Sequence, residues 1–368
     1  MLLLHFADLH LDAPFRWASP DRARRRRQGL RATLRRIVDL AREAGADAVL
    51  CAGDLYEQES LTPDTAAFVL DAIARLAPIP VFLAPGNHDW DGPRGLYRQA
   101  RWPAHVRVFH GDRLTPAPLG PGVTVWGAAH GAPAGTRGFL DGARVHGPGV
   151  HLAVFHGAER GWGIEDGAPA HDDPHAPFTA AEIEAAGLAH VFCGHYHAPR
   201  DAARHTYPGN PDPLTFGETG ERGVVLATVL DGAVARERRV VATSEVHDVE
   251  VDVSGCASGD AVRELVASRL RGLGGDARVS LRGDLAPSAE VGEDDVRDAA
   301  PWMATVVPER GRLGVAYDVA AISREPTVRG EFVRGLLEPG GDLDADTRRR
   351  VLITGLRALD GRGDLEVW

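Results

Sequence analysis

The sequence contains no lysine, so all 41 of its basic residues are arginine, and these are outnumbered by 52 acidic residues. The resulting formal net charge of −11 at pH 7 argues against binding a phosphate backbone through bulk electrostatic attraction. The acidic excess lies mostly beyond residue 242, where 24 acidic residues face 16 arginines; up to that point the counts are 28 and 25. Any contact with nucleic acid must therefore come from local patches, with metal ions supplying positive charge.

Cysteines and long apolar runs are also scarce. The three cysteines, Cys51, Cys193 and Cys256, stand far apart, which excludes a disulfide framework and a paired-cysteine zinc site. No segment approaches the roughly 20 apolar residues of a membrane span, and residues 1–6 lack a basic leader with a full apolar segment. We expect a protein of the reducing cytoplasm with no membrane segment, in which Cys51 and Cys193 are small buried residues.

What the sequence does contain is a series of five short polar motifs, each at the end of an apolar run. They are Asp8-Leu9-His10, Gly53-Asp54, Gly86-Asn87-His88-Asp89, Phe155-His156-Gly157 and Gly194-His195-Tyr196-His197. Such a run is typical of a buried parallel strand, and the carboxyl ends of parallel strands are where an open α/β sheet places its ligand site. We expect the five strand ends to bring these polar side chains to one rim.

The residue types in these motifs suit a pair of divalent metal ions. Carboxylate, amide oxygen and imidazole together favour Mn, Fe or Zn, and no thiolate lies among them. A two-metal hydrolase holds its ions about 3.5–4 Å apart and needs a bridging carboxylate. Asp54 is the natural bridge, because it stands alone in its motif between the other ligand groups. The predicted metal ligands are Asp8, His10, Asp54, Asn87, His156, His195 and His197.

Two residues beside the ligands are predicted to act in catalysis. His88 follows Asn87, which takes the metal role, so the His88 imidazole stays free to donate a proton to a leaving oxygen at neutral pH. Glu57 follows Asp54 by three residues and is placed to orient or charge His88. The residues that bind the substrate remain unknown at this point.

The order of expected elements predicts a layered α/β domain followed by a smaller one. Hydrophobic spacing and capping residues predict helices at 21–43, 63–76 and 178–186. Beyond the last motif, strands are expected at 204–207, 223–230 and 233–241, as meander pairs rather than βαβ units. From residue 243 the pattern changes to strand, helix, strand and helix, with two further helices at 328–337 and 344–359. We therefore expect domains at 1–242 and 243–368, the second a small α+β module.

The five motifs resemble those of the calcineurin-like metallophosphoesterase superfamily, whose pattern is D-x-H, G-D, G-N-H-D, H and G-H-x-H. The surrounding stretches are similar to one branch, the bacterial DNA-repair exonucleases of the SbcD and YhaO kind, which are related to the nuclease subunit of the double-strand-break repair complex. These stretches are ADLHLDAPF at 7–15, AGDLY at 52–56, YPGNP at 207–211 and FGETG at 216–220. The motif match spans roughly residues 1–230, and the later region resembles the family's capping domain only loosely.

The resemblance implies a fold of two mixed sheets flanked by helices, a smaller capping domain that binds a partner, and two metal ions, for which we expect Mn, with Fe or Zn as alternatives. It implies a coiled-coil ATPase as partner. In that family, the residues matching His88 are catalytic, and the two metals are bound by residues matching Asp8, His10, Asp54 and His197 on one side and Asp54, Asn87, His156 and His195 on the other. Many members carry His or Asp where this chain has Glu57, so the support of His88 differs here.

Three functions follow as hypotheses. The first is a metal-dependent DNA exo/endonuclease in DNA repair, and the second is a phosphoesterase that acts on a small-molecule or protein phosphate ester through the same site. The third, a non-catalytic scaffold, is disfavoured because the ligand set and His88 are intact. The stretches YPGNP and DLHLDAPF favour the nuclease, whereas the acidic second part opposes it. The sequence leaves open the cleavage polarity, the strand preference and whether the chain forms a homodimer.

Other polar and aromatic residues receive structural interpretations. The arginine run 24–27 lies largely opposite the apolar stripe of its helix, which favours a solvated face over contact with a DNA backbone. His171 and His175 lie in a polar loop and could approach the site, but a position on the surface is favoured. For the aromatic residues that follow the metal motifs, stacking on a base and packing in the core are equally favoured. These aromatic residues are Phe15, Trp17, Trp90 and Trp162.

Overall fold

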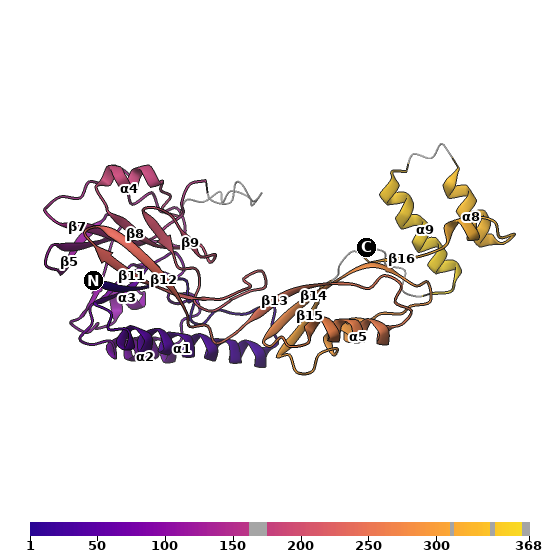
Figure 1. Cartoon of the computed structure of the whole chain (residues 1–368), viewed down its shortest axis with the longest axis horizontal. Helices are drawn as coiled ribbons and strands as arrows, with labels where there is room; N and C mark the ends of the chain where they lie inside the picture. The colour runs from indigo at the N-terminus through magenta and orange to yellow at the C-terminus, as the bar shows by residue number, and fades with distance from the viewer. Residues whose placement is uncertain (162–174, 310–312, 339–342, 363–368) are drawn as a thin grey trace. The chain divides into compact units, whose positions relative to one another are not determined.

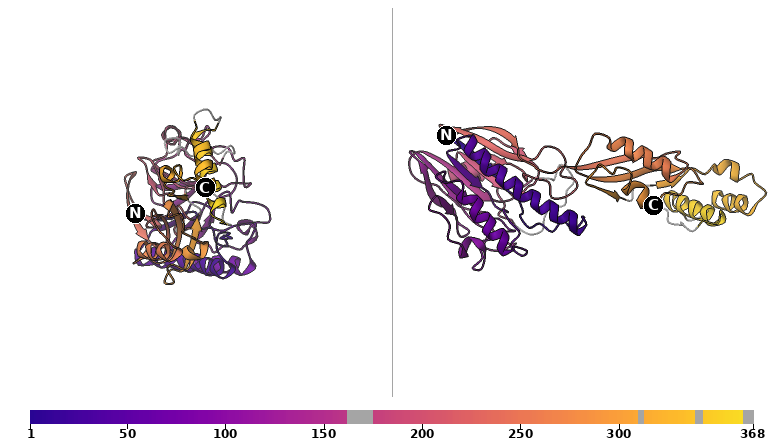
Figure 2. Two further views of the ribbon diagram at one scale, coloured as in Figure 1. Left: turned by 90° about the vertical axis from the view of Figure 1, so that its right-hand side faces the viewer. Right: turned by 90° about the horizontal axis from the view of Figure 1, so that it is seen from below.

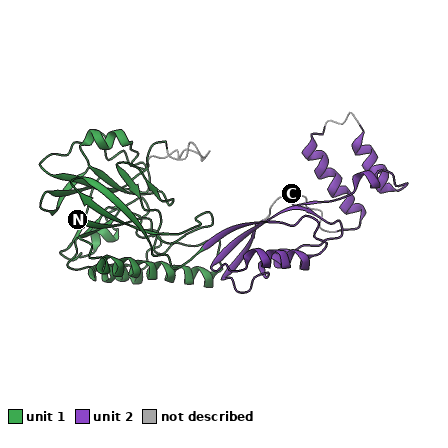
Figure 3. Cartoon of the chain, viewed as in Figure 1, with its two compact units in different colours: residues 1–245 green, residues 246–368 purple. Residues whose placement is uncertain are grey.

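The computed structural model describes residues 1–161, 175–309, 313–338 and 343–362. The chain divides into two compact units, Met1–Glu245 and Val246–Trp368 (Figure 3). The sequence pattern places the boundary between residues 242 and 243. Each unit has its own hydrophobic clusters, so each is described by itself below.

The first sheet of unit 1 has six strands in the order β12-β11-β1-β2-β3-β4. Its strands are β1 (Leu2–Phe6), β2 (Ala48–Cys51), β3 (Val81–Leu83), β4 (Val106–Val108), β11 (Gly223–Leu230) and β12 (Ala233–Val240). The first four are parallel, and β11 pairs antiparallel with both β1 and β12. The register pairs Phe6 with Cys51 and Cys51 with Leu83, so β1, β2 and β3 end side by side.

The second sheet also has six strands, in the order β5-β6-β7-β8-β10-β9. They are β5 (Thr115–Gly120), β6 (Val123–Gly127), β7 (Val150–His156), β8 (His190–Gly194), β9 (Arg200–Asp201) and β10 (His205–Tyr207). His156 is paired with Gly194, so β7 and β8 also end side by side. β10 forms an antiparallel pair with β9 and also lies parallel to β8, so the meander describes only one side of this strand; β11 and β12 form the expected antiparallel pair.

The two sheets pack face to face, with helices on both outer sides. Leu3 and Leu50 of the first sheet lie in one apolar cluster with Leu152 and Phe192 of the second. Because side chains alternate along a strand, their neighbours in the first sheet face the helices α1 (Pro20–Glu43) and α2 (Pro63–Ala74) instead. On the far side, α4 (Ala180–Ala186) covers the second sheet, as Figure 1 shows. The prediction of two mixed sheets flanked by helices is confirmed.

The helix ends follow the capping residues in the sequence. α1 begins after Ser19, whose side chain accepts a hydrogen bond from the backbone N–H of Arg22, with proline at its first position. α4 begins with a capping box between Thr179 and Glu182 and ends at Gly187, whose φ of 81° is left-handed. A short helix, α3 (Leu96–Gln99), follows the third metal motif.

The arginine run of α1 is not solvated along its whole length. Arg24 is exposed and pairs with Asp21 at 2.7 Å. Arg26, in contrast, is only 1% exposed; its guanidinium donates to the Pro213 carbonyl and to Asp212 Oδ1. The predicted solvated face is therefore wrong for Arg26, which anchors the segment around residue 212 to α1.

Unit 2 is a parallel sheet with helices. Its strands are β13 (Val246–Asp252), β14 (Asp276–Leu285), β15 (Thr305–Glu309) and β16 (Leu313–Val315), and β14 pairs with each of the other three. Helices α5 (Gly259–Leu270) and α6 (Glu293–Arg297) contribute Val262, Val266 and Val296 to its core. Figure 2 shows α5 running along one face of the strands.

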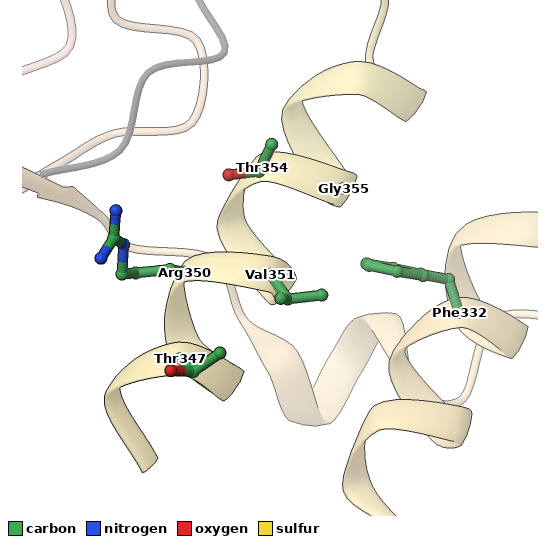
Figure 4. Close-up of a pocket in the computed structure, with 6 residues that line it drawn as sticks. All are labelled: Phe332, Thr347, Arg350, Val351, Thr354 and Gly355. Atoms are coloured by element: carbon green, nitrogen blue, oxygen red, sulfur yellow. The ribbon is translucent and has the colours of Figure 1, made fainter. Parts of the chain in front are cut away.

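The last three helices of unit 2 form a small separate cluster. They are α7 (Val319–Ile322), α8 (Val328–Leu337) and α9 (Ala345–Leu359), and Ile322, Val333 and Leu356 are buried among them. Phe332 of α8 and Val351 of α9 line an open groove of about 510 Å³ (Figure 4). α9 thus packs against its own unit through Leu356. Within the described ranges, no helix has the length and apolar character needed to cross a membrane.

Candidate metal centre

The five motifs meet where the two sheets of unit 1 present the carboxyl ends of their parallel strands. The first three motifs follow β1, β2 and β3 of one sheet, and the last two follow β7 and β8 of the other. The expectation of a single rim is therefore corrected: two sheet edges face each other across the site. Hydrogen bonds continue past the strand ends, from Asp8 N to Gly53 O at 3.0 Å and from His10 N to Asp54 O at 2.9 Å.

The predicted ligands lie together in overlapping groups. Asp8, His10 and His197 each offer one ligand atom within 4.8 Å of the others, and so do Asp8, Asp54 and His156. Asp54 Oδ2 is 3.2 Å from His156 Nε2 and 3.6 Å from His10 Nε2. One carboxylate oxygen thus stands between histidines of the two sheets, which is the position that a bridging ligand requires.

Asn87 and His195 complete the set. Asn87 is almost fully buried in the loop after β3. His195 places its ring 5.2 Å from that of His156, and its backbone N–H donates to both oxygens of Asp8, at 3.1 and 3.2 Å. His195 therefore lies beside the cluster, and Asn87 is buried in the loop that follows β3.

Buried polar atoms without partners show that the site fits cations. Among the described residues, His10 Nε2, His156 Nε2 and Asn87 Oδ1 are buried and have no hydrogen-bond partner. The other ring nitrogen of each histidine is occupied, because His10 Nδ1 donates to Glu57 at 2.7 Å and His156 Nδ1 donates to Ala52 O at 2.9 Å. Leaving lone pairs unsatisfied next to two carboxylates is unfavourable unless a cation binds there. The residues therefore fit a pair of divalent metals.

The ionisation of these groups reflects burial and the close approach of carboxylates to histidines. Burial raises the pKa of Asp8, against the attraction of His156 and His197. Burial also acts on Asp54, but His156 and His10 hold the pKa of this carboxyl well below its usual range. His156 shows the opposite balance: burial lowers its pKa, yet Asp54 and Asp8 raise it to about 9. The pocket therefore stabilises positive charge at its centre.

The backbone at the ligands is left-handed. Asp8, His10 and Asp54 have φ angles of 56°, 50° and 52°, and His195 has 117°. Non-glycine residues rarely adopt these values, and such strain persists only where the surrounding structure enforces it. Four of the seven predicted ligands are held in this way, and the bend turns their side chains from the strand direction into the site.

Two motif glycines are required by close packing. A Cβ at Gly86 would lie 2.2 Å from Asp54 Oδ1, and a Cβ at Gly194 would lie 2.1 Å from Ala52 O. Only glycine lets the third loop approach the carboxylate of Asp54 and the fifth loop approach the second strand. This explains why the ligand loops of the two sheets can come so close.

Comparison with known proteins identifies the chain. A family model described as calcineurin-like phosphoesterase matches residues 1–199, more than half of the sequence. The chain belongs to this family. The family's members are phosphoester hydrolases with a dinuclear metal centre, and the clustered Asp and His side chains agree with that description.

Curated relatives cover most of the chain at low identity. An uncharacterized metallophosphoesterase, YhaO of Bacillus subtilis, is 27% identical over 315 residues, which cover 76% of this phosphoesterase and 71% of the relative. The DNA double-strand break repair protein Mre11 of Methanopyrus kandleri is 26% identical over 259 residues, or 61% of this chain and 51% of that protein. Among solved structures, TT1561 of Thermus thermophilus aligns with a TM-score of 0.36 and 17% identity, covering 64% of this chain and 98% of its own.

His88 of this phosphoesterase lies at the exposed side of the centre. Its side chain is 46% exposed, and its ring is 4.7 Å from that of His10. His88 Nδ1 donates to Glu57 Oε2 at 2.9 Å, and this hydrogen bond raises the pKa of His88 to about 9. Burial opposes ionisation of Glu57, but its hydrogen bonds to His10 and His88 lower its pKa to about 2. Glu57 therefore contacts His88 as expected, and its second contact, with His10, was not foreseen.

Asp89 of the third motif forms hydrogen bonds with the backbone of the second motif. Its buried carboxylate accepts hydrogen bonds from the backbone N–H groups of Asp54, Leu55 and Gly86 at 2.7–3.0 Å, and from the hydroxyl of Tyr97 at 2.7 Å. Burial and the nearby charge of Asp54 raise the pKa of Asp89 to about 6. Sequence reasoning included Asp89 in a motif without giving it a role; its place directly after Asn87-His88 was the only signal.

Several residues of the site were missed because they lie far from the motifs. Glu218 Oε1 accepts a hydrogen bond from His197 Nδ1 at 2.6 Å. The stretch FGETG, which contains Glu218, was noted for its family resemblance alone. His175 stacks on His195 with ring centroids 5.1 Å apart, so its interpretation as a surface-loop residue is wrong. His130 is buried beside the site, and its Nε2 donates to the backbone oxygen of His156 at 2.8 Å.

The aromatic residues after the motifs pack within the protein. Phe15 is buried beneath the guanidinium of Arg26, which lies 5.2 Å from the ring centroid. Trp17 is half-buried against Phe216 at 4.7 Å and donates its Nε1–H to Leu214 O. Trp90 is likewise half-buried. Trp162 and His171 lie outside the described residues.

Proposed function

We propose that this phosphoesterase is a two-metal phosphodiester hydrolase that cleaves DNA. The observation that carries the proposal is the cluster of Asp8, His10, Asp54, His156 and His197, with His88 at its exposed edge and hydrogen-bonded to Glu57. Hydrolysis of a phosphate ester needs positive charge at the phosphoryl oxygens and a proton for the leaving oxygen. The first comes from the bound metals, and the second is the task that the position of His88 suits.

We assign metal binding and proton donation to different residues. Asp8, His10, Asp54 and His197 would hold one metal, and Asp54, Asn87, His156 and His195 the other. The two metals, when bound, supply Lewis-acid polarisation of the phosphate and activation of water. His88 donates its proton from the ring nitrogen that does not face Glu57, and Glu57 holds the His88 ring in orientation and favours its charged form.

DNA as the substrate is supported by the relatives. Mre11 of Methanopyrus kandleri, which is similar to 61% of this chain, is described as a DNA double-strand break repair protein. On the resemblance of the motifs and their surrounding stretches to the DNA-repair exonuclease branch, we further propose Mn as the native metal, a coiled-coil ATPase as a partner and the cytoplasm as the place of action.

A phosphate ester outside DNA is the alternative substrate, because the catalytic residues would be the same. One observation favours it: the net charge is −11, and the acidic excess is greatest beyond residue 242. A protein that binds long DNA gains affinity from basic surfaces, and in this acidic chain such surfaces would be limited to local patches.

The test is an assay of the metal-free full chain supplied with Mn²⁺, on linear duplex DNA, single-stranded DNA and a chromogenic phosphodiester. The proposal expects degradation of at least one DNA substrate, lost in His88→Ala. Hydrolysis of the chromogenic ester without any DNA cleavage, also in the presence of a candidate ATPase, would favour the alternative. Absence of hydrolysis of all three substrates would count against an enzyme of either kind.

A further inference from the structure

The histidines of the centre differ in what holds their Nδ1 atoms. His10 donates to the carboxylate of Glu57 at 2.7 Å, and His197 donates to the carboxylate of Glu218 at 2.6 Å. His156, on the opposite sheet, donates to a neutral backbone carbonyl, that of Ala52, at 2.9 Å. A carboxylate partner makes an imidazole a stronger ligand than a carbonyl does, because its negative charge stabilises the positive charge that the ring shares with a metal.

The hydrogen-bond donors around Glu218 fix which of its two carboxylate oxygens accepts from His197. Its Oε2 is taken by three N–H donors, Asn210 Nδ2 at 2.6 Å, Leu214 N at 2.6 Å and Thr215 N at 3.3 Å. Its Oε1 is left for His197 Nδ1. Because a carboxylate has no proton to give, His197 must carry its proton on Nδ1, which leaves the lone pair of Nε2 free for a metal.

The backbone of His197 is held by the same segment. Arg222 Nη1 donates to the carbonyl of His197 at 2.5 Å and to Asn210 Oδ1 at 2.6 Å, and Asn210 N donates to the same carbonyl at 3.2 Å. Asn210 is thereby oriented with its NH₂ group toward Glu218. Ring and main chain of His197 are both fixed by residues 210–222, a segment outside the five motifs.

We propose that Glu218 is a positioning residue that keeps the ring proton of His197 on Nδ1 and leaves Nε2 available to a metal. We further propose that the metal held by Asp8, His10 and His197 therefore binds with the higher affinity of the two. This rests on the two-metal assignment of the proposed function. Two arguments support the order of affinity. Both histidines of this metal have anionic partners, and Asp8 adds a second carboxylate to the shared Asp54, whereas Asn87 brings a neutral oxygen to the other metal.

The substitution Glu218→Gln tests the role of the carboxylate without removing its volume. The three N–H donors require the amide oxygen of Gln at the position of Oε2, which turns the amide NH₂ toward His197 Nδ1. Nδ1 must then accept, and the ring proton moves to Nε2, the atom that the metal needs. Glu221→Gln is the matched control, since it makes the same chemical change three residues away at an exposed position.

The experiment is a calorimetric titration of the metal-free full chain with Mn²⁺. The wild-type protein and Glu221→Gln are expected to bind two ions with distinct affinities. In Glu218→Gln the tighter affinity should fall by about 10–100-fold and the weaker one by less than about threefold, with an unchanged melting temperature of the metal-free protein. Two equal affinities in the wild type, or a Glu218→Gln titration like that of the control, would overturn the proposal.

A second measurement needs no variant. Crystals of the wild-type protein grown with one equivalent of Mn²⁺ should show anomalous scattering among Asp8, His10 and His197. A peak between Asn87 and His156 instead would refute the order of affinity while leaving the two-metal function intact. Wild-type protein that binds no Mn²⁺ at all would contradict both this proposal and the proposed function, so the two failures are distinguishable.

Discussion

Glu57 and His88 are joined by a hydrogen bond of 2.9 Å between a carboxylate oxygen and the ring Nδ1. The second oxygen of the same carboxylate lies 2.7 Å from Nδ1 of His10, a predicted metal ligand. One side chain therefore orients both the proposed proton donor and a ligand of the metal beside it. Substitutions of the two residues therefore have different effects: a change of His88 removes the proton donor alone, whereas a change of Glu57 also alters the partner of His10.

Replacing His88 by alanine should abolish turnover and spare the metals. We expect His88→Ala to lower the rate of phosphodiester hydrolysis by about 100- to 10,000-fold, because a positioned proton donor contributes that much. The bound Mn²⁺, measured by elemental analysis, should stay at the wild-type level, since His88 stands outside the ligand set. Loss of both metals in this variant would show that the role given to His88 is wrong.

Replacing Glu57 by glutamine should weaken catalysis without emptying the centre. The amide oxygen can still accept from His10 while its NH₂ group faces His88, so the orientation of His10 is kept and the negative charge behind His88 is lost. The same charge is lost behind His10, so we expect the hydrolysis rate to fall by about tenfold or more, with Mn²⁺ still bound at saturating concentration but held more weakly at the metal beside His10. Glu59→Gln, an exposed neighbour, is the control, and equal rates in the two variants would remove Glu57 from the mechanism.

Asp89 should contribute to the stability of unit 1 through the four hydrogen bonds that its buried carboxylate accepts. Asp89→Asn leaves at least one of the four hydrogen-bond donors around the carboxylate facing an NH₂ group. Each donor left without an acceptor costs about 1–3 kcal/mol of the free energy of unfolding, measured by urea denaturation. Tyr97→Phe removes a single donor, and it should cost less; a larger loss in Tyr97→Phe than in Asp89→Asn would argue against this account.

The stability of unit 1 should decrease as the pH is lowered, because the folded protein buries histidines in their neutral form. Burial, together with the charges of His190 and Arg238, lowers the pKa of His5 to about 3, against 6.5 for an unperturbed histidine. Between these two values the unfolded chain binds more protons than the folded one, so stability is complete above about pH 6.5 and is lost as the pH falls toward 3. Each such histidine contributes a slope of up to about 1.4 kcal/mol per pH unit.

The variant His5→Leu isolates this contribution. Its free energy of unfolding, measured in urea between about pH 7.5 and pH 5, should depend less steeply on pH than that of the wild type, because leucine does not titrate. Identical slopes in the two proteins would mean that His5 does not carry the effect.

Much of this protein follows from local sequence. The apolar runs before each motif predict the strands that end at Phe6, Cys51 and Leu83, because a buried parallel strand needs apolar residues on both faces. Thr179 and Gly187 predict both ends of α4 for equally local reasons. The chemistry of the centre also follows, since Asp, Asn and His at strand ends identify the kind of metal that suits them.

Contacts between distant segments were decided by tertiary structure alone. The five motifs meet from two sheets rather than along one rim, because β7 and β8 pair with each other and never with β1 or β2. Arg26 is buried by Asp212, 186 residues away, although its helix position predicts solvent. Glu218 reaches His197 through a loop with no periodic pattern.

The five motifs by themselves predict which residues bind metal and which histidine acts as proton donor. The tertiary structure decides which carboxylate stands behind each histidine, and so which ring nitrogen carries the proton. The physical reason is that ligand type is a property of one residue and its neighbours in the chain. Hydrogen-bond partners such as Glu57 and Glu218, in contrast, are set by the packing of loops that only the folded protein brings together.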